Sequence, residues 1–464
     1  MKAPYQATRA VAGSVVVVES GDYALNGSQL QIPIGDNFAV QTGLLHEVCF
    51  TEISSLSRDL SVVLGAVKCA DRSVRRQHGS TWSRHLKLTV PVYELSNWRK
   101  KEVVGSLTGA LQYLTGDYWN FEFVKRRRKP ESIGQVPLFG APDRSRVFVP
   151  FSHGLDSFAQ SELLKVEQAV DVIPVHLRSS NVERTLQSIG RASKRKLTPV
   201  SVSARVYEPK HAEPSFRTRP FLYDSLAAYA SVLSGGGAVV IPENGQGSLG
   251  GSLVRLGAEA PHRSCHPGFT SRLSHFLWNL TGERVSFIHP ALFKTKGEVL
   301  KELVDLRFDS DSWLSEHPSC SYDARHANRE GKQVHCGLCG NCLLRRMSIH
   351  AAGIADPTPY KVRNLHANSL EEALVADDEV RSLHAYKDVG RNAGRSMQRL
   401  AEITRSNENY RVDAEVEGLA RYQNRAVAEV REALVRMLDQ HHCEWTKFLS
   451  YAGKSSWVAK LARG

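Results

Sequence analysis

The chain has 464 residues, 42% of them hydrophobic, which is typical of a globular protein of two or three domains. Its net charge of +12 and pI near 9.3 indicate anionic partners such as nucleotides, nucleic acid or an acidic protein, although a basic surface without a partner also fits. No apolar stretch approaches the roughly 18 residues of a membrane span, and Val15–Val18 is too short for the core of a secretion signal. We therefore predict a cytoplasmic protein without a membrane partner.

The first predicted domain covers residues 1–140. Strand-like runs lie at 14–18, 60–67 and 86–95, and helical signals are few, mainly around 97–115. This mixture predicts a β-rich α+β extension. Near its end the basic run Lys-Arg-Arg-Arg-Lys-Pro, residues 125–130, indicates an exposed loop, which is either a solvated turn or a contact for an anion.

The second predicted domain, residues 141–355, alternates between strand and helix patterns. The expected strands cover residues 147–151, 172–176, 200–207, 238–241 and 285–288. The first expected helix ends near residue 168, and the others cover residues 182–194, 219–233, 269–280 and 296–306. Such alternation predicts an α/β fold with a doubly wound parallel sheet, which binds ligands at the carboxyl ends of its strands.

The third predicted region, residues 356–464, is largely helical. One apolar stripe recurs at helical spacing through the stretch 412–438, and it predicts a packing face. Its members are Val412, Val416, Leu419, Val427, Val430, Leu434 and Leu438.

A loop after the first strand of the second domain carries the sequence FSHGLDSF, residues 151–158. It lacks the Gly-Lys-Ser/Thr of a Walker loop and the three-glycine spacing of a dinucleotide site. Hydroxyls from Ser152 and Ser157, close backbone approach at Gly154 and a following helix N-terminus suit pyrophosphate, and Asp156 could help to hold Mg²⁺. A structural turn that caps a helix would look similar.

Four of the eight cysteines cluster late in the chain as Cys320, Cys336, Cys339 and Cys342. In a cytoplasmic protein such a cluster predicts a metal site sooner than disulfides. Four thiolates leave no open position on tetrahedral zinc, so the site would be structural. An unmetallated thiol cluster, an iron–sulfur cluster and a sulfur-transfer pair are the alternatives.

The loop resembles the Ser-Gly-Gly-x-Asp-Ser loop of the PP-loop ATP pyrophosphatase superfamily, with His153 where glycine is usual. Followed by the cysteine pattern, it resembles the 7-cyano-7-deazaguanine synthase (QueC) family over roughly residues 146–355. Arg219-Pro-Phe-Leu-Tyr, Thr295-Lys-Gly-Glu and Cys342-Leu-Leu-Arg are similar to further family segments. The resemblance implies an adenine nucleotide alpha hydrolase-like fold. It implies that nucleotide is bound by Phe151, Ser152, His153, Gly154, Leu155, Asp156, Ser157 and Phe158.

The family resemblance implies ATP-dependent adenylation of 7-carboxy-7-deazaguanine, followed by attack of ammonia and release of AMP and pyrophosphate. The implied cofactors are ATP, Mg²⁺ and Zn²⁺. Each step needs relief of developing negative charge, for which Arg219 and Lys296 are the expected sources, beside a catalytic Asp156. Ordinary surface or capping charge is the alternative role of the two cations.

The chain departs from the housekeeping pattern in its length and in the loop after the fourth strand. Here that loop is Pro242-Glu-Asn-Gly, which resembles the enlarged QueC-like proteins of the Qat and type IV CBASS anti-phage systems. This implies a changed acceptor, the N-terminus of a partner protein, with Glu243 and Asn244 expected to recognise the base or deprotonate the amine. Glu243 could equally cap a turn.

Two other functions stay open on the sequence. A PP-loop enzyme that modifies tRNA would suit the basic charge and the run at 125–130, so nucleic acid is a possible partner. Thiolation of this kind needs a catalytic cysteine pair, however, and a zinc site would occupy the one obvious cluster of cysteines in the sequence. The third hypothesis is a module that binds nucleotide without turnover because His153 disables the loop.

Overall fold

The computed structural model describes residues 14–19, 30–35, 38–76, 82–129, 145–152, 154–167, 171–177, 199–206, 212–255, 257, 260–306, 314, 319–321, 327–329, 332–374 and 383–463. The helix expected over 182–194 and the expected role of His153 lie outside these residues. Across the described part of the chain, no helix combines the length and the apolar character needed to cross a membrane.

The middle of the chain folds around a six-stranded sheet with the order β10-β9-β6-β7-β8-β3. Its strands are β3 (Phe38–Gln41), β6 (Val147–Pro150), β7 (Val172–Leu177), β8 (Val200–Val206), β9 (Ala238–Val240) and β10 (Ser286–Ile288). The last five pair in parallel, and β3 runs antiparallel to β8 at the edge. The predicted α/β class is confirmed, and each strand predicted in this domain matches an observed one.

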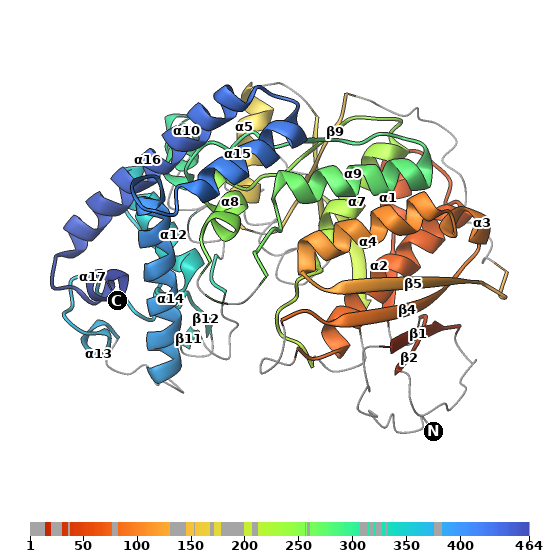
Figure 1. The fold of residues 1–464 in the computed structure, drawn as a ribbon, viewed down its shortest axis with the longest axis horizontal. Helices are drawn as coiled ribbons and strands as arrows, with labels where there is room; N and C mark the ends of the chain where they lie inside the picture. Colours follow the sequence, from red (N-terminus) through yellow and green to blue (C-terminus); the bar gives the residue numbers. More distant parts are fainter. Residues whose placement is uncertain are drawn as a thin grey trace.

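Helices lie between these strands along the chain and after the last of them (Figure 1). They are α5 (Leu155–Glu167), α7 (Arg219–Leu233), α8 (Gly245–Leu253), α9 (Pro267–Thr281) and α10 (Lys296–Asp305). Local signals set where they begin: His266 precedes a proline at the start of α9, and Thr295 with Glu298 forms a capping box at α10. The helix predictions were correct for α5, α7, α9 and α10, whereas α8 was missed because its glycine-rich sequence was interpreted as a loop.

The N-terminal zone forms a second sheet of order β2-β1-β4-β5, made of β1 (Ser14–Val18), β2 (Leu30–Pro33), β4 (His85–Val92) and β5 (Tyr118–Lys125). All its neighbours pair in parallel, so it is of α/β type and the α+β prediction was wrong. The zone also supplies β3 to the central sheet. Its helices are α1 (Gly43–Val48), α2 (Ser55–Ser73), α3 (Leu95–Trp98) and α4 (Lys101–Thr115).

The strand predicted over 60–67 was also wrong, because these residues lie inside α2. Ser54 caps that helix by accepting a hydrogen bond from the backbone N–H of Ser57. Every residue from Leu60 to Val67 is buried, so the segment has no polar face to reveal a helical period. A short apolar run of this kind does not distinguish a buried helix from a strand.

The C-terminal third forms a helical layer beside the central sheet (Figure 1). Beyond the short strands β11 (Asn328–Arg329) and β12 (Lys332–Gln333), it comprises α12 (Gly340–Ala351), α13 (Leu370–Ala373), α14 (Leu383–Glu402), η1 (Ile403–Arg405), α15 (Tyr410–Gln423), α16 (Val427–Ala452) and α17 (Trp457–Arg463). The predicted stripe divides between α15 and α16 at left-handed Asn424, and its members share one core cluster. The exception is Val427, which is 40% exposed.

Candidate active site

The order of strands in the central sheet reverses at β6, because β7 lies on one side of it and β9 on the other. Loops that leave the carboxyl ends of two such strands diverge and open a crevice for ligands. Asp156 follows β6 in the first turn of α5, Glu243 and Asn244 follow β9, and Lys296 begins α10 after β10. Three separate loops thus converge at one place.

Four of the predicted site residues are in direct contact there. The Lys296 ammonium lies 2.5 Å from Oδ2 of Asp156, and Asn244 Nδ2 donates to the other Asp156 oxygen at 2.9 Å. The same Asn244 nitrogen donates to Glu243 Oε1 at 2.8 Å, while its side-chain oxygen caps α8 by accepting from Gly247 N–H at 3.0 Å. A Cβ at Gly247 would lie 2.2 Å from Glu243 Oε1, so a larger residue there would displace the Glu243 carboxyl group.

The protonation state of Glu243 depends on its charged neighbours in this cluster. Burial, followed by the nearby Asp156 carboxylate, raises the pKa of Glu243 to about 8, although Lys296 partly opposes that rise. Glu243 can therefore hold or release a proton near neutral pH. A single ammonium serves two carboxyl groups, which is an arrangement suited to moving protons and neutralising a developing anion.

The FSHGLDSF loop places its two hydroxyl groups together. Ser152 and Ser157 oxygens lie 3.0 Å apart, and the backbone N–H of Ser152 donates to Ser157 Oγ at 3.2 Å. The carbonyl of Gly154 starts the α5 ladder by accepting from Phe158 N–H. Hydroxyls at a helix N-terminus suit a phosphate.

Three apolar positions of the loop belong to the core. The side chains of Phe151, Leu155 and Phe158 are buried, so a ligand contact at these positions would have to use the backbone. The role predicted for them, and for the rest of the loop, stays a prediction.

Arg219 stands apart from the cluster. It is exposed at the start of α7, and its guanidinium lies over the Tyr223 ring at 5.3 Å and donates to the Tyr223 hydroxyl at 3.4 Å. Among the described residues, no contact joins Arg219 to Asp156 or Lys296. Its predicted catalytic role therefore has no support in the geometry of the free protein.

The C-terminal helix α16 supports the site with residues that the sequence did not single out. The backbone N–H of Lys296 donates to Gln246 Oε1 at 2.8 Å, and Gln246 Nε2 lies 2.9 Å from Nδ1 of His441. The other ring nitrogen of His441 lies 3.0 Å from the Met397 carbonyl oxygen. Burial lowers the pKa of His441 to about 4, so the neutral ring accepts from Gln246 and donates to Met397.

A second link from α16 reaches the α10 cap. Thr295, which precedes Lys296, donates its hydroxyl to Glu444 Oε1 at 2.6 Å. Arg436 forms an ion pair with Glu298, the other member of the capping box. No local pattern could reveal these contacts, because 149 positions separate Thr295 from Glu444 and 138 separate Glu298 from Arg436.

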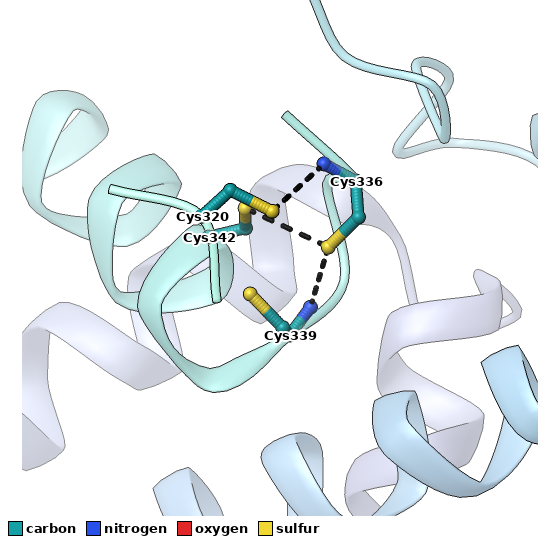
Figure 2. A group of neighbouring side chains, drawn as sticks. All are labelled: Cys320, Cys336, Cys339 and Cys342. Carbon is teal, nitrogen blue, oxygen red and sulfur yellow. Dashed lines mark hydrogen bonds between the residues drawn. The ribbon is translucent and has the colours of Figure 1, made fainter. Parts of the chain in front are cut away.

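The predicted cysteine cluster is confirmed as a cluster (Figure 2). All four Sγ atoms lie within 4.8 Å of one another, and those of Cys336 and Cys342 are 3.7 Å apart. Tetrahedral zinc with Zn–S bonds of about 2.3 Å requires S–S separations of about 3.8 Å, so these residues fit the ion. Backbone N–H groups of Cys336 and Cys339 donate to cluster sulfurs at 3.3 Å, which favours thiolates.

The four cysteines lie in closely packed surroundings. Gly337 has a φ of +87°, and a Cβ there would lie 2.5 Å from the Val362 carbonyl oxygen. Arg345 is fully buried and donates to Thr358 and Ser319 on the segments that flank the cluster. Arg345 thus links the segments on both sides of the cysteine cluster. Helix α12, which begins at this cluster, packs against α10.

Comparison with curated proteins gives partial matches of one description. The chain is similar to 7-cyano-7-deazaguanine synthases. The match to the protein of Ruegeria pomeroyi is 61% identical over 31 residues, 7% of this chain and 14% of that protein. With the protein of Paracoccus denitrificans it is 30% identical over 123 residues, 26% of this chain and 48% of that protein. With that of Methanococcus maripaludis it is 32% identical over 96 residues, 21% and 40% of the two chains.

These relatives support a QueC-like family. The matched segments reach at most half of the length of the relatives described, and they leave most of this chain unmatched. No family model and no solved structure matches the chain.

Proposed function

We propose that this chain is an ATP-dependent, C–N bond-forming enzyme that adenylates 7-carboxy-7-deazaguanine or a similar acid. Pyrophosphate leaves in the first step, and an amine then displaces AMP to form an amide. The observation that carries the proposal is the contact of Lys296, Asp156, Asn244 and Glu243 at the switch point, beside the paired hydroxyls of the loop. The similarity to 7-cyano-7-deazaguanine synthases supplies the substrate class.

Each residue has a distinct role in this proposal. Hydroxyls from Ser152 and Ser157 hold the pyrophosphate end of ATP, and Lys296 neutralises charge that develops at the α-phosphate. Asp156 already has two partners, so Mg²⁺ would enter with the nucleotide phosphates and take an oxygen of this carboxylate. Arg219 is proposed as a second cation that neutralises this charge, because it is exposed and is the first residue of α7, at the same edge of the sheet.

We propose the N-terminus of a partner protein as the acceptor amine, with ammonia as the other candidate, in an anti-phage role. The enlarged terminal zones and the Pro242-Glu-Asn-Gly loop motivate this part. A chain terminus needs an open crevice and a docking surface, and the zones beside the central sheet provide additional surface (Figure 1). Zinc, held by the four cysteines, would stabilise the fold and take no part in the chemistry.

Modification of tRNA is the second candidate, motivated by the net charge and by the exposed Arg127 and Arg128 that follow β5. The backbone N–H groups of these two arginines are held by Glu19, which fixes the turn and leaves their side chains outward. An RNA substrate would predict binding that weakens steeply with salt.

The test is product analysis of the purified protein with ATP, Mg²⁺ and 7-carboxy-7-deazaguanine, with and without ammonium chloride. The proposal predicts AMP that depends on the acid, and an amide product when ammonium is present. ADP as the only product, or AMP made equally without the acid, contradicts it. Nucleotide binding without turnover under all these conditions would favour a binding module.

A further inference from the structure

A buried carboxyl group without a partner lies on α7. Asp224 is 5% exposed, its Oδ2 atom is inaccessible, and no described residue donates a hydrogen bond to that oxygen. Burial raises the pKa of Asp224 well above its usual range, and no cation in the described part of the chain counters that rise. An uncompensated buried carboxyl opposes folding, so its presence calls for a ligand or a function.

Two other buried carboxylates, Asp117 and Asp71, have cationic partners. Asp117 bonds to Arg76 and Arg84, and Asp71 bonds to Arg84 and to the Thr218 N–H and hydroxyl. The Thr218 bond anchors the start of α7, so Asp224 is not needed to hold that helix. Among the residues that the structure describes, Asp224 therefore differs from these two in having no cationic partner.

Topology places Asp224 at the edge of the sheet where the site lies. In a strand–helix–strand crossover, the helix begins at the carboxyl edge of the first strand, and Asp224 lies in the second turn of α7. Helix α7 packs against β6 and β9, the two strands that flank the switch point. The carboxyl group is therefore near the level of the loops that carry Asp156 and Glu243.

The loop before α9 links Asp224 to the site. Its Cys265 thiol has a pKa raised by burial and then by the negative charges of Glu243, Asp224 and Asp156. One thiol thus lies within electrostatic reach of all three carboxyl groups. The loop is fixed there because His266, next in sequence, caps α9 and lies 2.9 Å from the Tyr113 hydroxyl.

The group that Asp224 lacks is a compact cation that can donate hydrogen bonds. Lys296, the ammonium of the cluster, is already paired with Asp156. ATP and the acid are anions, so neither can supply the positive charge. The remaining reactant of the proposed function is an amine, which is a protonated ammonium ion in neutral water.

Building on the proposed function, we infer that Asp224 binds the ammonium group of the acceptor and takes one proton from it. The carboxyl group first loses its own proton to water as the cation binds, and the resulting carboxylate is the base. The nitrogen lone pair then forms the C–N bond with the acyl carbon. The bond from that carbon to the AMP phosphate oxygen breaks, and AMP leaves with the electron pair. The second proton passes from the nitrogen to water. Asp224 thus acts in the second half-reaction and has no part in adenylation.

The experiment compares Asp224→Asn with the wild-type protein and with Ser225→Ala, a matched change at the next buried position of α7. Acid-dependent exchange of labelled pyrophosphate into ATP reports adenylation alone. Amide formation is then measured with ammonium chloride, with triglycine as a peptide amine, and with hydroxylamine, which is largely unprotonated at neutral pH. The Asn variant should keep pyrophosphate exchange, which also shows that it folds.

With ammonium and triglycine, amide formation by Asp224→Asn should fall about 100-fold or more, as expected for loss of a general base. With hydroxylamine the loss should be several-fold smaller, because no proton has to be removed first. Equal losses for all three amines, unchanged amide formation, or loss of pyrophosphate exchange would each overturn the inference. Absence of exchange in the wild-type protein would instead overturn the proposed function, and the inference with it.

Discussion

Replacement of His441 by leucine should uncouple the C-terminal helices from the active site. His441 is fully buried and joins Gln246 to the Met397 carbonyl, so leucine leaves two polar groups without a partner. Each such group costs about 1–3 kcal/mol, which gives a loss of unfolding free energy of about 2–6 kcal/mol. Gln246 would then no longer be fixed as the acceptor for the Lys296 N–H.

The effect on activity follows from geometry. A shift of about 1 Å in a catalytic group lowers rates by roughly 100-fold, so acid-dependent AMP formation should fall between about 10- and 100-fold. His442→Leu is the matched control, because His442 is adjacent on α16 and bonds to the Ala401 carbonyl instead of to Gln246. It should lose about 1 kcal/mol of stability and keep its activity.

Urea unfolding and AMP release, measured at a temperature where both variants are folded, separate the two effects. A His441→Leu protein with lower stability and full activity per folded molecule would refute the view that α16 positions Lys296.

Three further predictions concern Lys296, the cysteine cluster and the buried histidines. Lys296→Met should lower acid-dependent AMP formation by about 100–1,000-fold. Lys294→Met, which removes a half-exposed ion pair with Glu302, should leave AMP formation nearly unchanged in the same assay. Cys339→Ser should lose one equivalent of zinc by metal analysis and unfold at lower temperature, whereas Cys443→Ser, outside the cluster, should retain the metal. Burial lowers the pKa values of His46 and His441 to about 4 in the folded protein. As the pH falls below about 6.5, the unfolded chain therefore binds protons at these two histidines before the folded protein does. Each histidine should lower the free energy of unfolding by about 1.4 kcal/mol per pH unit down to about pH 4. Urea unfolding between those pH values checks this, and His441→Leu should reduce the slope by one proton; an unchanged slope would show that His441 titrates normally.

Much of the central domain could be predicted from the sequence because its signals are local. Strand–helix alternation, the proline after His266 and the Thr295–Glu298 capping box each act within a few residues. The same holds for the cysteine knuckle, where Gly337 permits the turn that brings two thiols together. Convergence of Asp156, Glu243 and Lys296 then follows from the rule that parallel strands share a carboxyl edge.

The remaining features depend on tertiary contacts that leave no pattern in the sequence. The buried run from Leu60 to Val67 has apolar residues on every side, so only packing decides that it is a helix. The pairing of β3 with β8 joins residues more than 160 positions apart. The support that His441 gives to Gln246 and the isolation of Asp224 are likewise properties of the assembled fold.

Exchange of labelled pyrophosphate into ATP, with 7-carboxy-7-deazaguanine and Mg²⁺ present and every amine acceptor omitted, tests the central claim most directly. The account predicts exchange that requires the acid and is abolished by Lys296→Met. Exchange without the acid, or none at protein concentrations where the wild-type chain binds ATP, would contradict the assignment of this site to acid adenylation.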